Sequence, residues 1–230
     1  MTGAIHLPKA DNWQLAKGDL AHRIEHLNLV GLKSLLVAFI VFSLERKDGP
    51  NGLPPMPNER ALCQLHHAAT VFLLKQPGRY RKTNVNIQRD GVVTFLPPPW
   101  AEVPRQMVAF FGELAVLWRE GDALDVAAFA LWRITWVHPF RDGNGRTAFA
   151  FAYGCLCLKL GGLLPYTDTV LDQMLAAPAQ CNELLRAMDE SISETPNGRP
   201  DLSALKLYLD QLLLNQIRAA ETVHGPAARP

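Results

Sequence analysis

The chain has 230 residues, 48% of them hydrophobic, and its 23 basic and 22 acidic residues leave a formal net charge of +1. This length suits one domain with a single sizeable core. The balanced charge argues against nucleic acid or an anionic membrane as a partner, and the longest apolar run, Ala148–Leu158, is short of the roughly 20 residues that span a bilayer.

The cysteines and the N-terminus indicate the compartment. Four cysteines in a chain of this length are sparse for a disulfide framework, so we expect buried thiols rather than disulfides or a metal site. The first residues lack the basic and apolar regions of a secretion signal. We expect a soluble, cytoplasmic protein, and export as an effector by another signal stays open. The four are Cys63, Cys155, Cys157 and Cys181.

The first part of the chain is predicted to be helical. Apolar residues recur at helical spacing, for example at Ile24, Leu27, Leu32 and Leu36. A loop rich in glycine and proline follows at 48–57, and Pro57 and Asn58 can begin a helix at 59–75. We therefore predict a mainly α protein, with residues 1–57 as a helical extension packed on the core.

Residues 83–95 break the helical pattern. The segment 83–88 alternates Val85 and Ile87 with polar residues, 89–91 can turn, and 92–95 is rich in β-forming residues. We predict a β-hairpin on a helical body. Two strands alone are marginally stable in water, so the hairpin either packs on the helices, pairs with a bound peptide or is a loop without function.

The segment with the most chemical content joins two apolar helices. A helix at 126–137 runs into HPFRDGNGR, residues 138–146, and a second begins at 144–147 and continues to a stop at Gly161 and Gly162. Gly143 and Gly145 permit positive φ and close backbone approach, and the N-H groups at a helix start form an anion site. A phosphate can bind there without a basic surface.

The side chains of this loop complete a set for phosphoryl transfer. His138 can accept a proton from a hydroxyl, Asp142 can hold Mg²⁺, and Arg146 can donate to phosphate oxygens. Each residue alone has a structural explanation, such as a helix end or a turn. The ordered combination favours chemistry that depends on positioning and charge neutralisation.

HPFRDGNGR resembles the signature of the Fic family, HPF-x-D/E-GNGR, at every specified position. The similarity extends over GRYRKTNVNI at 78–87, VPRQMVAFFGEL at 103–114 and LKLGGLLP at 158–165. It implies a Fic domain at 58–218, and from the terminal residues we expect a disordered tail at 219–230. The implied fold is a compact all-α Fic domain with a small β-hairpin flap over the active-site loop.

The resemblance also implies roles for individual residues. His138 would be the general base, Asp142 would hold Mg²⁺, Phe140 would anchor the loop inward, and Arg146 would bind nucleotide phosphates. Gly143, Asn144 and Gly145 would form the phosphate cradle. In the family mechanism a target hydroxyl attacks the α-phosphate of ATP, AMP is transferred and pyrophosphate leaves. The flap would dock an extended segment of the target protein through Thr83, Val85, Ile87 and Val93.

The chain departs from the family pattern at two places. Many Fic enzymes have a second arginine where this chain has Phe149, and an apolar ring cannot hold a γ-phosphate. Many are also restrained by a glutamate in an S/T-x-x-x-E-G/N motif, from a partner or from their own helix. The nearest segment here, AHRIEH, contains Glu25 but lacks the flanking residues. Glu25 is either a remnant inhibitory residue or a solvated helix charge.

Three functional hypotheses follow. The first is a protein adenylyltransferase that uses ATP and Mg²⁺ to modify a Ser, Thr or Tyr hydroxyl of a target protein. The second is a Fic enzyme with another phosphoryl-containing donor, because of Phe149. The third is an inactive Fic domain that binds a protein partner. An inhibitory partner protein is compatible with each of the two enzyme hypotheses.

Overall fold

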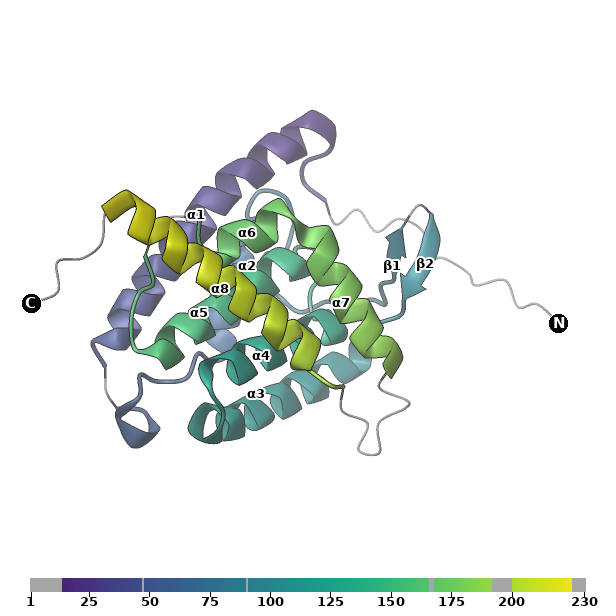
Figure 1. Cartoon of the computed structure of the whole chain (residues 1–230). Coiled ribbons are helices and arrows are strands. Elements are labelled where there is room, and N and C mark those ends of the chain that lie inside the picture. Colours follow the sequence, from purple (N-terminus) through teal and green to yellow (C-terminus); the bar gives the residue numbers. More distant parts are fainter. Residues whose placement is uncertain (1–13, 47, 90, 166–167, 192–199, 225–230) are drawn as a thin grey trace, which may run out of the picture.

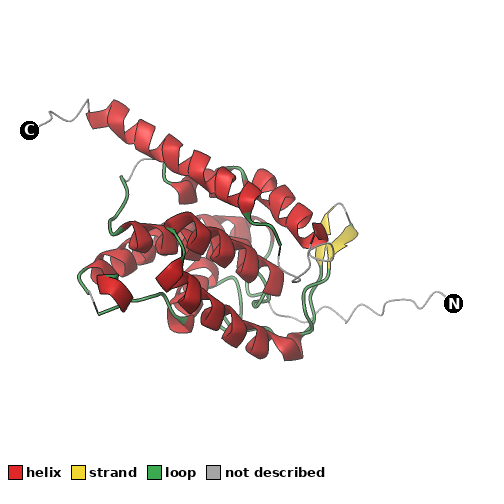
Figure 2. Ribbon diagram, turned by 60° about the horizontal axis from the view of Figure 1, so that its bottom comes forward, coloured by secondary structure: helices red, strands yellow, loops and turns green. Residues whose placement is uncertain are grey.

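The computed structural model describes residues 14–46, 48–89, 91–165, 168–191 and 200–224. It confirms an all-α fold, in which the described residues form eight α-helices and one two-stranded sheet (Figures 1 and 2). In chain order the helices are α1 (Gly18–Leu44), α2 (Glu59–Thr70), α3 (Val103–Glu120), α4 (Ala123–Val137), α5 (Asn144–Leu160), α6 (Val170–Ala176), α7 (Pro178–Ser191) and α8 (Ser203–His224).

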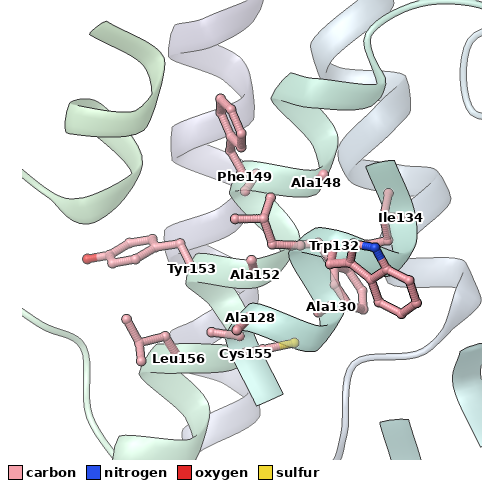
Figure 3. Packing of buried hydrophobic residues seen from close by; sticks show 14 of the residues in the cluster. Ala128, Ala130, Trp132, Ile134, Ala148, Phe149, Ala152, Tyr153, Cys155 and Leu156 are labelled. Carbon is pink, nitrogen blue, oxygen red and sulfur yellow. The ribbon is translucent and has the colours of Figure 1, made fainter. Parts of the chain in front are cut away.

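Helix α5 lies at the centre of the core, and α1, α2, α4 and α6 all pack against it. Its apolar sequence is buried on every side from Thr147 to Leu158. Figure 3 shows the packing between α4 and α5, where alanines and large apolar side chains lie close together. A small residue also permits the close approach of α1 to α5: a Cβ added at Gly154 would lie 3.1 Å from Leu36 Cδ1 of α1.

Local capping residues fix the helix ends that position the site. Asp122 accepts a hydrogen bond from Asp125 N in a capping box that begins α4. Gly161, at φ +73°, ends α5. These boundaries agree with the sequence prediction of two apolar helices joined by a tight loop.

Helix α2 ends at Thr70 rather than at the expected Lys75. The amide nitrogen of Asn28, from α1, donates to Val71 O at 2.8 Å and to Ala69 O at 3.4 Å, which satisfies carbonyl groups at this helix end. Leu15 N donates to Leu73 O at 2.8 Å, so an N-terminal segment pairs with the chain just beyond α2. These partners are distant in sequence, and the local pattern could not reveal them.

The hairpin forms, but it is shorter than predicted. Strand β1 (Ile87–Arg89) pairs antiparallel with β2 (Val92–Phe95), with Ile87 opposite Phe95 and a register irregularity beside it. Residues 83–86 lie outside the strand and form its stem. Both views place the hairpin at the edge of the helical body (Figures 1 and 2).

The C-terminal boundary also differs from the prediction. Helix α8 continues to His224, so residues 219–224 are helical rather than a disordered tail. Residues 225–230 lie outside the described residues.

Helix α1 is long and apolar enough to cross a membrane by length and composition, with a mean hydropathy of 2.1 over 18 residues. The sequence expectation considered only uninterrupted apolar runs and did not identify this helix. Asn28 and Lys33 of this helix have partners in the domain, since Asn28 binds the end of α2 and Lys33 forms an ion pair with Asp172. Helices of soluble proteins pass the same test, so composition alone is weak evidence of a membrane span.

Candidate active site

His138 is the C-cap of α4 and adopts a left-handed conformation with φ 50° and ψ 57°. Its Nδ1 lies 3.4 Å from Thr135 O, and a carbonyl oxygen can only accept, so Nδ1 carries the proton and Nε2 is free to accept one. Burial is the main cause that lowers the pKa of His138 to about 4. His138 is therefore neutral at pH 7, the state required of a general base.

The loop after His138 is held by its own side chains. Asn144 Oδ1 accepts from Phe140 N at 2.9 Å, and its Nδ2 donates to Phe140 O at 2.9 Å. Both functional groups of this side chain are therefore used inside the loop, and Asn144 can contribute to a phosphate cradle through its backbone N-H. Phe140 is fully buried, as expected of an inward anchor.

Gly143 makes the turn into α5. Its φ is +77°, and a Cβ at this position would lie 2.5 Å from Thr70 Cγ2, so only glycine fits without movement. Gly145 lies inside the first turn of α5, where positive φ is absent and a Cβ would meet nothing within 4 Å. The structure thus requires a glycine at position 143 and shows no backbone or steric requirement for one at position 145.

The start of α5 offers donors for an anion. The first intrahelical bond joins Thr147 N to Gly143 O, which leaves the N-H groups of Asn144, Gly145 and Arg146 without an intrahelical acceptor. The positive end of the helix dipole adds to their effect. This geometry suits a phosphate group.

Arg146 is paired with Glu25 of α1. Its Nη1 lies 2.5 Å from Glu25 Oε1, with 15% and 41% of the two side chains exposed. The contact meets the distance of an ion pair, yet the buried Nη1 has no hydrogen-bond partner of adequate geometry. The structure therefore brings Glu25 into the site, where its carboxylate lies against one guanidinium nitrogen of Arg146.

His66, which the sequence analysis did not single out, supports the loop from α2. Gly78 N donates to His66 Nδ1 at 2.8 Å, so Nδ1 is the acceptor and Nε2 donates to Asp142 O at 2.8 Å. The imidazole stacks on Phe140 with 3.7 Å between ring centroids. Burial is the main cause that lowers its pKa to about 4, which keeps this tautomer uncharged at pH 7.

Arg81, also missed from the sequence, contacts both the loop and the flap. Its Nε donates to His138 O at 2.8 Å, and its backbone N donates to Pro139 O at 2.8 Å. Beside it, Arg141 Nη1 donates to Thr83 Oγ1 at 2.6 Å. Neither His66 nor Arg81 has a local signal, because their partners lie 76 and 57 residues away.

A cavity of about 450 Å³ opens onto these groups. His138, Asp142, the first residues of α5 and Phe149 line it, together with Glu25 and the neighbouring His22 and His26 of α1. Phe149 is 3% exposed, so an apolar ring occupies the position of the second family arginine. Among the residues that the structure describes, none of the flap lines this cavity.

The predicted flap residues are only partly accessible. Val93 is 43% exposed, whereas Thr83, Val85 and Ile87 are half-buried. The flap is thus attached to the loop at its stem, through the bond between Arg141 and Thr83. The edge of the hairpin remains open to a further strand.

Asp142 fits the expected magnesium ligand by the chemistry of its donors. Its Oδ1 accepts from Gly143 N at 2.6 Å, and the exposed carboxylate lines the cavity. Among the described residues no group of three His, Cys, Asp or Glu side chains forms a metal cluster. Mg²⁺ commonly uses one or two carboxylates and substrate phosphates, and the carboxylate of Asp142 beside the start of α5 fits this set of donors.

The four cysteines are free thiols. Cys155, Cys157 and Cys181 are buried and Cys63 is half-buried, as expected from the sequence. Burial raises the pKa of each thiol above its usual value.

Part of the chain, including the loop, is similar to known proteins. Residues 57–156 match the model of the Fic/DOC family. The curated "Protein adenylyltransferase Fic" of Nematostella vectensis is 38% identical over 76 residues, which are 32% of this chain and 16% of that protein. The chain therefore spans only a small part of this relative.

Two solved structures share the fold. A Fic family protein from Desulfovibrio desulfuricans G20 superposes with a TM-score of 0.67 at 19% identity, over 93% of this chain and 57% of that one. A Fic domain containing signaling protein from Bacteroides thetaiotaomicron VPI-5482 superposes with a TM-score of 0.67 at 19% identity, over 93% of this chain and 78% of that one. Residues 57–156, which contain the loop, are thus similar to the Fic/DOC family, and the fold is the one that these two Fic structures share.

Proposed function

We propose that the protein is an adenylyltransferase that moves AMP from ATP to a Ser, Thr or Tyr hydroxyl of a target protein. The observation that carries this proposal is that neutral His138 and the phosphate-binding start of α5 line one cavity. A base and an anion site at one cavity are the parts that transfer of a phosphoryl group to a hydroxyl requires.

In the proposed reaction, Nε2 of His138 takes the proton of the target hydroxyl, and the oxygen attacks the α-phosphorus. The new O-P bond forms as the bond to pyrophosphate breaks, and pyrophosphate leaves. Arg146 and the N-H groups of α5 hold the phosphate oxygens. Asp142 would hold Mg²⁺, which neutralises phosphate charge when bound.

The test is labelling of protein extracts with ATP that carries ³²P at the α position. The unmodified protein should label a target in the presence of Mg²⁺, and His138→Ala should abolish the label. His67→Ala is the matched control, because His67 is an exposed histidine of α2 outside the cavity lining. Equal labelling by the unmodified protein and His138→Ala would refute the role of the base.

A second candidate keeps the chemistry and changes the donor. The buried ring of Phe149 in the cavity favours it, because loss of one charge-assisted contact to the γ-phosphate costs on the order of 1.5 to 3 kcal/mol. Labelled ATP, other nucleotides and a phosphocholine-type donor should be compared, with Phe149→Arg alongside. Mass spectrometry of the target identifies the added group, and efficient AMP transfer by the unmodified protein contradicts this candidate.

We also propose that Glu25 restrains the site. Its carboxylate pairs with Arg146 and so competes with phosphate oxygens for the same nitrogen. Glu25→Gln should therefore raise nucleotide affinity about 10-fold, which corresponds to the 1.5 kcal/mol of a charge-assisted contact. Glu45→Gln, an exposed change at the other end of α1, is the control. Calorimetry measures the nucleotide affinity. If Glu25→Gln left this affinity unchanged, Glu25 would be a surface charge of the helix with no inhibitory role.

A further inference from the structure

We propose that Arg81 is a positioning residue that couples the flap to the general base. The proposal rests on the function proposed above, in which His138 accepts the proton, and on the expectation from the sequence that the flap docks the target. One side chain then links the place where the target binds to the place where it reacts.

The first half of this link is at the end of α4. Arg81 donates through Nε to His138 O at 2.8 Å and through Nη2 to Val137 O at 3.3 Å. The last carbonyl groups of a helix lack intrahelical donors and attract positive charge. His138 itself is left-handed, a conformation that a residue with a Cβ holds only when its surroundings enforce it. Arg81 supplies that enforcement at the carbonyl of the strained residue.

The second half of the link is at the flap. The same guanidinium donates through Nη1 to Thr83 O at 3.2 Å and through Nη2 to Pro98 O at 2.5 Å. Thr83 precedes β1 and Pro98 follows β2, so both stems of the hairpin are attached to one planar group. Arg81 is 5% exposed, and burial lowers its pKa to about 10, so it remains charged at pH 7.

The shape of the guanidinium is what makes this coupling specific. Its donors lie in a rigid plane and point in several fixed directions, which allows simultaneous bonds to the helix end and to both stems. A lysine ammonium is a compact charge with three rotating donors, and it cannot reach this set of carbonyls together. Arg81→Lys therefore keeps the charge and removes the connection.

The experiment compares Arg81→Lys with Arg79→Lys, an equal change at an exposed arginine two residues away. For Arg81→Lys we expect kcat to fall about 10- to 100-fold, since a misplacement of about 1 Å can cost a factor of 100. The KM for the target protein should rise, while the Kd for ATP stays within about twofold, because Arg81 does not touch the α5 cradle. Arg79→Lys should behave as the unmodified protein.

Hydrogen exchange provides a readout that does not depend on transfer. Arg81→Lys should raise the rate of amide hydrogen exchange both in 83–98 and at His138. The protection of the amides in α8 should stay unchanged. Unchanged exchange and kcat in Arg81→Lys, or equal losses in kcat, ATP binding and global protection, would overturn the coupling. If the unmodified protein transfers nothing, the proposed function fails, and the exchange data still decide whether flap and base are linked.

The unmodified protein gives a second measurement in case Arg81→Lys does not fold. The Arg81 amide, bonded to Pro139 O, and the His138 amide, bonded to Ile134 O, should then exchange at similar rates. If the Arg81 amide instead exchanged faster than the His138 amide, at the rate of the hairpin, the flap and the end of α4 would open independently. That result would overturn the proposal.

Discussion

The loop His138–Arg146 and the flap hairpin 87–95 are neighbours with opposite constructions. The loop is enclosed: Phe140 is fully buried, His66 and Asn144 bond to its backbone, and Gly143 fits against α2. The hairpin has exposed strands and is attached chiefly at its stems. Rigid placement suits groups that must meet a reacting atom, whereas an open strand edge suits a target segment that has yet to bind.

The largest expected effect comes from breaking the enclosed loop at Gly143. Gly143→Ala places a Cβ 2.5 Å from Thr70 Cγ2 at φ +77°, so we expect a loss of about 2 kcal/mol or more of unfolding free energy. Transfer activity should fall as well, because the turn positions α5. Urea unfolding and the labelling assay measure the two effects.

Gly145→Ala is the matched control, because its Cβ meets nothing within 4 Å in a helical turn. Its unfolding free energy should change by less than about 0.5 kcal/mol. A Gly143→Ala protein as stable as Gly145→Ala would show that the loop can move, contrary to its enclosed construction.

The next effect concerns His66. His66→Leu removes the bonds to Gly78 N and Asp142 O and leaves both backbone groups without that partner, so we expect a cost of about 1 to 3 kcal/mol. Mg²⁺-dependent nucleotide binding should weaken, since the Asp142 backbone loses its support. Calorimetry checks the binding, and His67→Leu on the exposed side of α2 is the control.

The pH dependence of stability tests the burial of two histidines in and beside the enclosed loop. Burial lowers the pKa of His66 and of His138 to about 4, below the ordinary value of 6.5. The unfolded chain therefore binds more protons between pH 6.5 and 4, and stability falls as pH drops through this window. Each histidine contributes a slope of about 1.4 kcal/mol per pH unit. Asp189, whose pKa burial raises to about 6, acts in the opposite direction.

Differences between variants isolate the histidines. The unfolding free energy should be measured in urea at several pH values between 7 and 4.5. Its slope against pH should be smaller in His138→Ala than in the unmodified protein, by the amount that corresponds to about one proton. An identical slope would mean that His138 titrates normally in the folded state. That outcome would remove the physical basis for calling it a buried neutral base.

The loop was predictable from sequence and its supports were not. Residues 138–146 are contiguous, and their glycines, charged groups and flanking apolar helices indicate a phosphate site directly. His66 and Arg81 act on partners 76 and 57 residues away, and a lone histidine or arginine is usually structural or solvated. The early end of α2 depends on Asn28 of another helix. The sequence leaves Glu25 open between a remnant inhibitory residue and a solvated helix charge, and its contact with Arg146 emerges only from the fold.

The smallest effect on stability is expected in the flap. This prediction tests whether the exposed hairpin, unlike the enclosed loop, serves target binding. Val93→Thr keeps a β-branched side chain at a position that is 43% exposed, so the unfolding free energy should change by less than about 0.5 kcal/mol. The KM for a target should nevertheless rise, because an apolar contact beside the docked strand is lost. Val108→Thr, an exposed change on α3, is the control. An unchanged KM would place target docking elsewhere and leave the hairpin as a structural appendage of the loop.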